Sequence, residues 1–414
     1  MGAFFDALET RSPEAREADL LARLPAQVAH ARSASSFYRK LLGGVDPAEV
    51  RSRAALSRLP VTRKSELAEL QRAERPFGGL NATPPSELAR ILVSQGPIYD
   101  PEGRRPDYWR TARSLFAAGF RRGDVVLNCF SYHLTPAGSM FETGLHHLGC
   151  AVIPGGTGQT ELQARVIADL APAGYVGTPS FLKLIVEKAD ELGLACACVR
   201  RALVSGEALM PVVRAFLDAR GIAAFQAYGT ADLGLVAYET EAREGLVLSE
   251  DVILEIVRPG TGDPVADGEV GEVLVTTFNA DYPLLRFATG DLSAVLAGAG
   301  ASPCGRTNVR IKGWMGRADQ TTKVRGLFVH PHQVAEVLRR HGLARARLVV
   351  GNTEGADHMV LRIERDAVAD NALLATAIET SLRDLMKLRG TVEFVPPGSL
   401  PNDGKVIEDA RTYS

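Results

Sequence analysis

The chain has 414 residues, 46% of them apolar, and carries 47 Lys and Arg against 49 Asp and Glu. This length predicts two or three domains with a sizeable core, and the balanced charge excludes a general field for nucleic acid or anionic lipid. The odd number of cysteines, five, favours free thiols in a reducing compartment. No segment approaches the roughly 18 apolar residues of a membrane span, and the N-terminus lacks a signal-peptide pattern. We therefore expect a cytoplasmic protein that binds neither nucleic acid nor membrane.

The order of predicted elements indicates an α/β protein. Residues 1 to about 90 favour helices with polar connections. Short β-branched runs then alternate with longer amphipathic ones, which is typical of a mainly parallel sheet covered by helices. The predicted strands are residues 124–130, 150–155, 174–180, 201–206 and 223–229.

The rest of the chain has two further patterns. Residues 245–315 are β-rich with tight turns, and residues 320–414 favour a separate α+β module with a helix near 369–388. We therefore predict a large N-terminal domain, 1–316, of helix-flanked parallel sheets with a β-rich subdomain. A small mobile α+β C-terminal domain, 317–414, would follow it.

The predicted parallel strands end in small or polar residues. Examples are Gly155, Ser205 and Thr230. Because the carboxyl ends of parallel strands form the ligand crevice of such sheets, five such ends favour a binding site. Turns also prefer these residues, so the pattern alone has a plain structural alternative.

Several short segments could carry chemistry, although each alone has a plain alternative as a turn or solvated loop. They are "SQGPIYDPEG" (94–103), "PGGTGQT" (154–160), "QAYGTADLG" (226–234), "LRFATGDLS" (285–293), "GWMGRADQTTKVRG" (313–326) and "LPNDGK" (400–405). A Tyr ring can stack on a purine, and a carboxylate can hold Mg²⁺ or accept hydrogen bonds from ribose hydroxyls.

Together, the order and spacing of these segments resemble the adenylate-forming superfamily. The resemblance is to its phenylacetate-CoA ligase branch, and it adds "SFYRKLL", "LPVTRKSEL", "TPSFL" and "CGRT" (304–307). It covers nearly the whole chain. The resemblance implies that ATP activates a carboxylic acid to an acyl-adenylate, whose acyl group then passes to coenzyme A. The acid expected is an aryl or arylacetic acid, and a homodimer is one assembly that we consider.

The resemblance also implies roles for single residues around the nucleotide. Gly206 and Glu207 would line the adenine side, and Tyr228 and Gly229 would form the adenine-stacking pair. Asp291 would bind the ribose.

In the C-terminal region, Arg317 would be the partner of the ribose ligand and Asp319 the hinge between the two half-reactions. Gly326 would lie beside the path of the pantetheine arm. Lys405 would bridge the acid and the α-phosphate, where a cation offsets the repulsion between two anions.

Three departures from the family pattern accompany these roles. The first is "YGTAD" (228–232), in which the hydroxyl is displaced to Thr230, and Asp232 is one methylene short for the Mg²⁺ role. The second concerns zinc, because some relatives carry a Cys/His site here. "YETEAREGLVLSED" has no Cys or His, and only Cys304 of the later pair survives, so we expect no structural zinc.

The third departure is "SQGPIYDPEG", which matches the family's phosphate loop by position. Ser94 and Gly96 remain, but Pro97 and its two successors replace the Thr-Thr-Gly part, and no lysine follows. We expect weak binding of the triphosphate and comparatively good binding of AMP or acyl-adenylate.

Two alternative functions stay open. One is an adenylating enzyme whose acyl acceptor is a carrier protein or an amine. The other is a non-catalytic protein that binds nucleotide or acyl-CoA, which the degenerate loop favours and the retained Asp291, Arg317 and Lys405 oppose. Tyr132, Phe141 and Ala208 are guesses at the lining of the acid pocket.

Overall fold

The computed structural model describes residues 3–298, 300–315, 317–318, 322–329, 331–353, 355–365, 371–401 and 405–411. The chain divides into two compact units. The larger comprises Met1–Leu209 with Val213–Trp314, and the smaller comprises Met210–Val212 with Met315–Ser414. Within the described residues, we find no helix both long and apolar enough for a membrane crossing.

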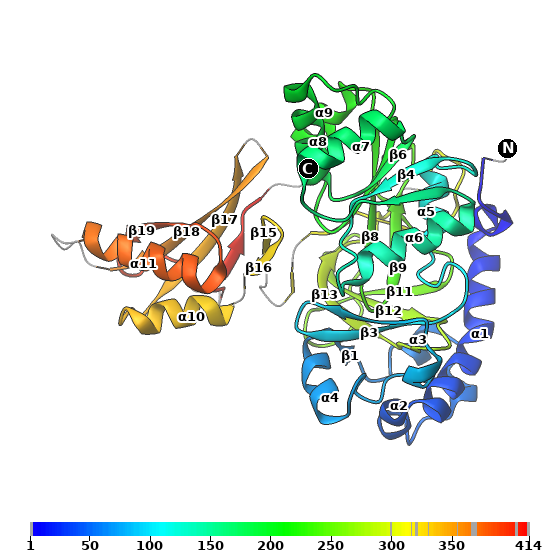
Figure 1. The fold of residues 1–414 in the computed structure, drawn as a ribbon. Coiled ribbons are helices and arrows are strands. Elements are labelled where there is room, and N and C mark those ends of the chain that lie inside the picture. The colour runs from blue at the N-terminus through cyan, green and yellow to red at the C-terminus, as the bar shows by residue number, and fades with distance from the viewer. Residues whose placement is uncertain are drawn as a thin grey trace. The chain divides into compact units, whose positions relative to one another are not determined.

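Helices come first along the chain, and helices and strands then alternate from residue 125 to residue 218 (Figure 1). The α-helices are α1 Pro13–Ala34, α2 Ser36–Leu41, α3 Arg53–Leu56, α4 Leu67–Ala73, α5 Ala112–Ala117, α6 Pro136–Leu148, α7 Thr160–Leu170, α8 Pro179–Leu192 and α9 Pro211–Asp218. The 3₁₀ helices are η1 Ala7–Thr10, η2 Pro47–Glu49, η3 Lys64–Glu66 and η4 Pro85–Glu87.

An eight-stranded sheet forms the centre of the larger unit, in the order β14-β10-β9-β8-β7-β6-β4-β5. Its strands are β4 Val125–Asn128, β5 Ala151–Pro154, β6 Gly174–Gly177, β7 Arg201–Val204, β8 Ala223–Thr230, β9 Gly234–Glu239, β10 Leu246–Leu248 and β14 Arg310–Ile311. The pairs among β4 to β8 are parallel, and those from β8 to β14 are antiparallel. All five strands predicted between residues 124 and 229 are therefore confirmed as one parallel set.

The two faces of each strand explain how helices attach to this sheet. In β4, β6 and β7, Val126, Val176 and Leu203 belong to one core cluster with Leu115 of α5 and Leu145 of α6. Because side chains alternate across a strand, the next residues point to the opposite face. The continuous apolar runs visible in the sequence thus supply apolar side chains to both faces of the parallel strands.

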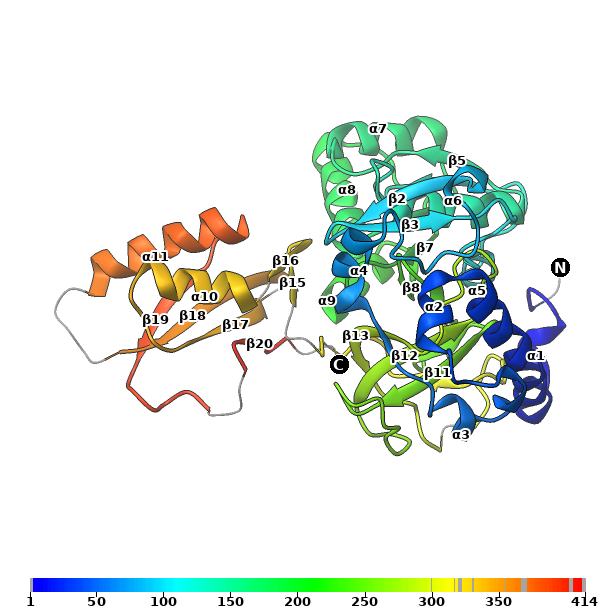
Figure 2. The same ribbon diagram turned by 90° about the horizontal axis from the view of Figure 1, so that it is seen from below.

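A four-stranded sheet in the order β1-β13-β12-β11 makes up most of the β-rich region. The strands are β1 Thr62–Arg63, β11 Val252–Val257, β12 Gly271–Thr277 and β13 Phe287–Ser293. Helices α1 and α2 lie against it (Figure 2), and their buried residues share one core with those of β11 and β12. The short β1 pairs in parallel with β13, Thr62 opposite Phe287, and so ties the N-terminal helices to the strand that carries Asp291.

A two-stranded hairpin contains most of the stretch "SQGPIYDPEG". It consists of β2 Arg90–Ser94 and β3 Ile98–Glu102 in antiparallel register, with Ser94 opposite Ile98. None of the strands predicted from the sequence includes this hairpin. Helix α5 begins only at Ala112, because Asp107 and Arg110 have left-handed backbones with φ of 46° and 62°, which a helix does not accept.

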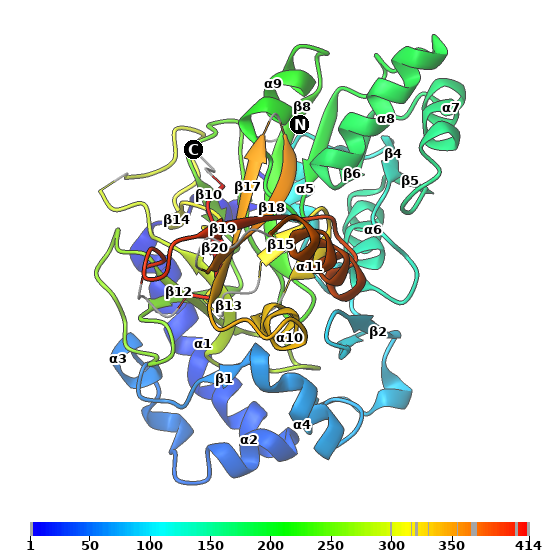
Figure 3. The same cartoon turned by 90° about the vertical axis from the view of Figure 1, so that its left-hand side faces the viewer.

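The smaller unit is an α+β module, as predicted. Its sheets are β15 Thr322–Val324 with β16 Leu327–Val329, and β19 Thr391–Val395, β18 Ala356–Glu364, β17 Ala346–Thr353 and β20 Ile407–Asp409 in that order. Helices α10 Pro331–Arg340 and α11 Asn371–Met386 lie side by side on one face of the four-stranded sheet (Figure 2; Figure 3). The expected α/β class is confirmed, and the mobility of this unit stays a prediction.

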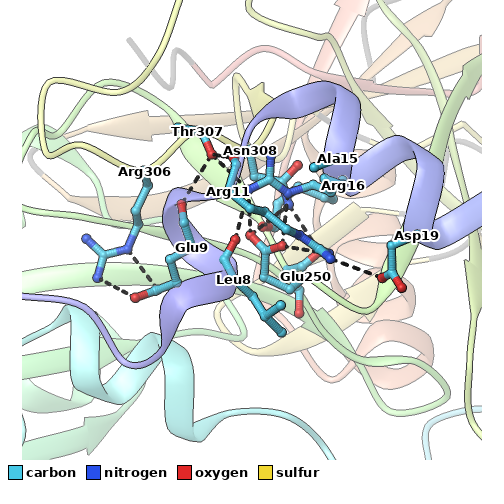
Figure 4. A network of polar contacts seen from close by, with 12 residues as sticks. Leu8, Glu9, Arg11, Ala15, Arg16, Asp19, Glu250, Arg306, Thr307 and Asn308 are labelled. Carbon is cyan, nitrogen blue, oxygen red and sulfur yellow. Dashed lines mark hydrogen bonds and ion pairs between the residues drawn. The ribbon is translucent and has the colours of Figure 1, made fainter.

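Buried ion pairs attach the N-terminal segment to the loop that contains "CGRT" and to the connection between β10 and β11 (Figure 4). The Glu9 carboxylate accepts hydrogen bonds from Arg306 Nε at 2.9 Å and from the Tyr238 hydroxyl at 2.8 Å. Glu250 accepts two from Arg16, at 2.9 and 3.1 Å. These contacts involve the two segments, "YETEAREGLVLSED" and "CGRT", in which the sequence predicts no structural zinc.

Candidate functional site

Asp291 lies at the centre of a buried polar group on β13. Its carboxylate accepts a hydrogen bond from the Tyr228 hydroxyl at 3.0 Å and another from Trp314 Nε1, also at 3.0 Å. Its backbone N–H donates to Thr289 Oγ1. Two donors from different elements therefore fix the orientation of the carboxylate that was predicted to bind ribose.

Asp232, the predicted Mg²⁺ ligand, forms an ion pair with Lys64. Lys64 Nζ is 2.5 Å from Asp232 Oδ2, and the carboxylate is fully buried, whereas the lysine side chain is 21% exposed. Asp232 Oδ1 has no hydrogen-bond partner among the described residues. The pair joins η3, near the N-terminus, to the turn between β8 and β9.

Asp100, on β3, is a third carboxylate of this group. It is completely buried, and neither of its oxygens has a hydrogen-bond partner in the described part of the chain, although Ser94 lies beside it. Burial, and next the Asp232 carboxylate, raise the pKa of Asp100 well above its ordinary value, while Lys64 offsets part of this effect. The environment therefore favours the neutral acid.

The Lys64 ammonium interacts electrostatically with all three carboxylates. Burial by itself would lower the pKa of the Lys64 ammonium, but the charges of Asp232, Asp100 and Asp291 together raise it. The ammonium thus stays protonated at neutral pH. Lys64 therefore lies near the segments that were predicted to hold phosphate, magnesium and ribose. We call Lys64, Asp100, Asp232 and Asp291 the Lys64 cluster.

The remaining predicted nucleotide residues of the larger unit lie in the turn after β7 and at the end of β8. Gly206 has φ of +83° in the turn after β7, and Glu207 accepts a hydrogen bond from the backbone N–H of Ser180 at the start of α8. A side chain at Gly229 would meet the Gly234 carbonyl oxygen at 2.6 Å, so the close approach of β8 and β9 requires glycine. Thr230 Oγ1 accepts from Leu233 N at 3.1 Å. These contacts stabilise the turns, and the ligand roles stay predictions.

The predicted residues of the smaller unit are Arg317, Gly326 and Lys405. Arg317 is half-buried, and Gly326 lies in the exposed turn between β15 and β16 with φ of +82°. Lys405 is exposed and lines a shallow cavity of about 240 Å³ together with Arg345 and Arg347. The predicted hinge, Asp319, lies outside the described residues.

Two of the three guesses at an acid pocket, Phe141 and Tyr132, have other contacts in the structure. Phe141 is buried and stacks on Phe130, with ring centroids 4.7 Å apart. The Tyr132 hydroxyl accepts a hydrogen bond from Asn128 Nδ2 at 2.7 Å. Both residues therefore hold the region around β4 and α6 together.

No group of three or more His, Cys, Asp or Glu residues suited to a metal ion occurs in the described residues. Cys304 Sγ instead lies 3.1 Å from Ser302 Oγ and 3.5 Å from Arg306 Nη1. The expectation of no structural zinc stays a prediction.

Comparison with known proteins identifies the family. Residues 107–279 match the family described as AMP-binding enzyme. The phenylacetate-coenzyme A ligase of Thermus thermophilus is 32% identical over 434 residues, which cover 95% of both chains. The chain belongs to the phenylacetate-CoA ligase family. The Escherichia coli phenylacetate-coenzyme A ligase is 33% identical to this family member, over 97% of this chain and 95% of the relative.

A solved structure shows the same fold. The 2-hydroxyisobutyryl-CoA ligase with 2-HIB-AMP and CoA, in the thioesterification state, superposes on this phenylacetate-CoA ligase family member with a TM-score of 0.80. The match covers 98% of this chain and 92% of the other at 24% identity. The likeness at this identity concerns the fold.

Sequence reasoning missed Lys64 and Asp100 as parts of the site in this phenylacetate-CoA ligase family member. Both residues lie inside segments that it quoted, "LPVTRKSEL" and "SQGPIYDPEG". The signal available was the charge itself, because an acid within a phosphate-loop position needs a nearby cation. The partner could not be found from spacing, since 168 positions separate Lys64 from Asp232.

Proposed function

We propose that this protein is an ATP-dependent, AMP-forming acid–CoA ligase that activates an aryl or arylacetic acid through an acyl-adenylate. The observation that carries the proposal is the identity of 32–33% to two phenylacetate-coenzyme A ligases across nearly the whole chain. The contacts of Tyr228 and Trp314 with the buried Asp291 support it, because they orient a carboxylate that could accept from two ribose hydroxyls.

The reaction has two transfers. In the first, a carboxylate oxygen of the acid attacks the α-phosphorus of ATP, the bond to the bridging oxygen breaks, and pyrophosphate leaves. In the second, the CoA sulfur attacks the acyl carbon, its thiol proton is released, and the bond to AMP breaks. Lys405 would offset the repulsion between carboxylate and phosphate in the first transfer, where two anions meet.

A magnesium ion fits the donors that this chain offers. Mg²⁺ is commonly held by one or two carboxylates together with substrate phosphates and water, and the unpartnered Asp232 Oδ1 supplies one such oxygen. The ion would neutralise charge on the triphosphate. The shorter Asp232 side chain then sets how near the phosphates must come to the β8–β9 turn.

A panel of carboxylic acids, scored by acid-dependent pyrophosphate release, tests the proposal. We expect release with arylacetic or aromatic acids and AMP as the second product. Thioester formation with CoA, compared with amine and carrier-protein acceptors, then identifies the acceptor. Pyrophosphate release with no acid of the panel would refute the ligase function, and release without thioester would favour a different acceptor.

The hairpin favours one second candidate, a protein that binds nucleotide without turning it over. Pro97 has no N–H to donate, and Asp100 places an acid in the phosphate-loop segment. Under this alternative, AMP binds and no acid releases pyrophosphate.

A homodimer, which also stays a prediction, would be checked by the mass in solution from light scattering.

A further inference from the structure

The phosphate hairpin β2–β3 supplies no free cation to a bound triphosphate. "SQGPIYDPEG" contains neither Lys nor Arg, and Arg90 on β2 is paired with Glu102 at 2.6 Å. A triphosphate carries several negative charges, and the hairpin adds the buried Asp100 carboxyl. Binding there therefore requires a cation from elsewhere in the chain.

The segment β1–η3–α4 brings such a cation to the hairpin. Gln71 of α4 is buried and makes two hydrogen bonds to the Tyr99 backbone, Nε2 to the carbonyl at 2.9 Å and Oε1 from the N–H at 2.7 Å. Strand β1 is fixed to β13 at the other end of the segment. Lys64 lies between these two attachments, next to Asp100 and within the field of Asp291.

The charges around Lys64 indicate that its ammonium can contact a ligand in addition to Asp232. The ammonium contacts one carboxylate, Asp232, while Asp100 has two buried oxygens without partners in the described residues. The lysine side chain is partly exposed above a fully buried aspartate. It can therefore contact a ligand on its open side and keep Asp232 on the other.

We propose that Lys64 is the cation of the phosphate site, and that its ammonium binds the β- and γ-phosphates of ATP in place of the lysine that the hairpin lacks. Asp232 holds the ammonium in position before ATP arrives. This inference deepens the proposed ligase function and rests on it. It also changes the expectation of weak triphosphate binding, because the missing donor comes from a segment 30 residues upstream of Ser94.

The test compares Lys64→Ala and Lys64→Arg with the control Lys183→Ala. Lys183 forms a similar lysine–carboxylate pair, 2.6 Å from Glu187, on the surface helix α8. Calorimetry measures ATP·Mg and AMP binding to each protein. Loss of a charge-assisted contact should weaken ATP binding by about 10- to 150-fold, with AMP binding unchanged, and Lys64→Arg should recover part of the affinity.

A second measurement separates phosphate binding from a structural role. Thioester formation from synthetic acyl-adenylate and CoA uses no triphosphate, so Lys64→Ala should retain it while losing ATP-dependent pyrophosphate release. An equal loss of both half-reactions, or of ATP and AMP affinity together, would show that Lys64 only supports the fold and would overturn the inference. ATP binding equal to wild type would overturn it too.

The failure of the proposed function is distinguishable from this outcome. A wild-type protein that binds ATP but turns over no acid fails the ligase proposal, and the calorimetric comparison of ATP with AMP still decides the role of Lys64. Wild type that binds neither nucleotide refutes both. If Lys64→Ala does not fold, Lys64→Arg and Lys64→Gln carry the same comparison, and full ATP affinity in Lys64→Gln refutes the assignment.

Discussion

Replacing Glu9 by Gln should strongly destabilise the larger unit. The Glu9 carboxylate is fully buried and accepts hydrogen bonds from Arg306 (Figure 4). It also accepts hydrogen bonds from the Tyr238 hydroxyl and the Phe5 backbone N–H. Arg306 itself is only 4% exposed, so the substitution leaves a buried guanidinium without its counter-charge. Breaking such a pair from one side costs about 3–5 kcal/mol.

The matched control is Glu17→Gln. Glu17 also pairs with an arginine, and Arg53 Nε lies 2.8 Å from it, but the two side chains are 38% and 43% exposed. Water solvates both groups after the change, and exposed pairs contribute about 0–1 kcal/mol. The two substitutions remove the same chemical group and differ in burial.

Urea unfolding followed by tryptophan fluorescence measures both variants. The two tryptophans, Trp109 and Trp314, lie in the larger unit, so the signal reports the part of the chain that contains Glu9. We expect Glu9→Gln to lower the free energy of unfolding by several times more than Glu17→Gln. Equal effects would mean that Arg306 finds another counter-charge or water, and the reasoning from burial would be wrong.

Four further predictions concern the site and the connection between the units. Asp291→Asn places an amide N–H₂ against two donors, so AMP binding should weaken by about 10- to 150-fold in calorimetry; unchanged affinity would remove this residue from the ribose site. Lys405→Ala should lower adenylate formation by about 10²- to 10³-fold and spare thioester formation from synthetic acyl-adenylate, and equal loss in both assays would contradict its role. Burial and the Asp232 charge raise the pKa of Asp100 in the folded protein. The neutral carboxyl group is therefore tolerated fully below the ordinary pKa of 3.8, and stability is lost as the pH rises through the raised pKa. Asp100→Asn should therefore raise the unfolding temperature at neutral pH and flatten its pH dependence, and calorimetry showing the same pH profile as wild type would refute this. Limited proteolysis should cut between residues about 312 and 326 at a ligand-dependent rate, and cutting only near the chain ends would oppose a mobile C-terminal unit.

Local sequence patterns predicted the parallel strands because the information they need is local. Most of β4 to β8 are short apolar runs, and side chains from these runs pack against α5 and α6 in one core cluster. The hairpin was missed because β3 reads "IYDPE", in which a proline and two acids argue against a strand. A two-stranded hairpin accepts them, since only one edge of each strand is paired.

The sequence predicted only part of the candidate site, for a different reason. Tyr228, Asp232 and Asp291 lie in segments with a recognisable motif, and the structure brings Tyr228 and Asp291 within hydrogen-bond distance. Lys64 lies in a segment whose motif carries no implied role, and its contact with Asp232 depends on β1 pairing with β13. Such a contact follows from tertiary structure, which no local pattern contains.

The Lys64 cluster also connects the stability of the protein to its activity. Three carboxyl groups around one ammonium leave an excess of negative charge in a buried place, and the raised pKa of Asp100 is one result of it. A polyanion could enter only if the ammonium turned towards it or if a divalent cation came with it. Turning the ammonium away reduces the positive charge left for Asp100 and favours its neutral form further, whereas an entering cation would offset part of this effect. The loss of lysine from the hairpin and the gain of a buried acid there are therefore compatible with ATP binding, provided that Lys64 is present.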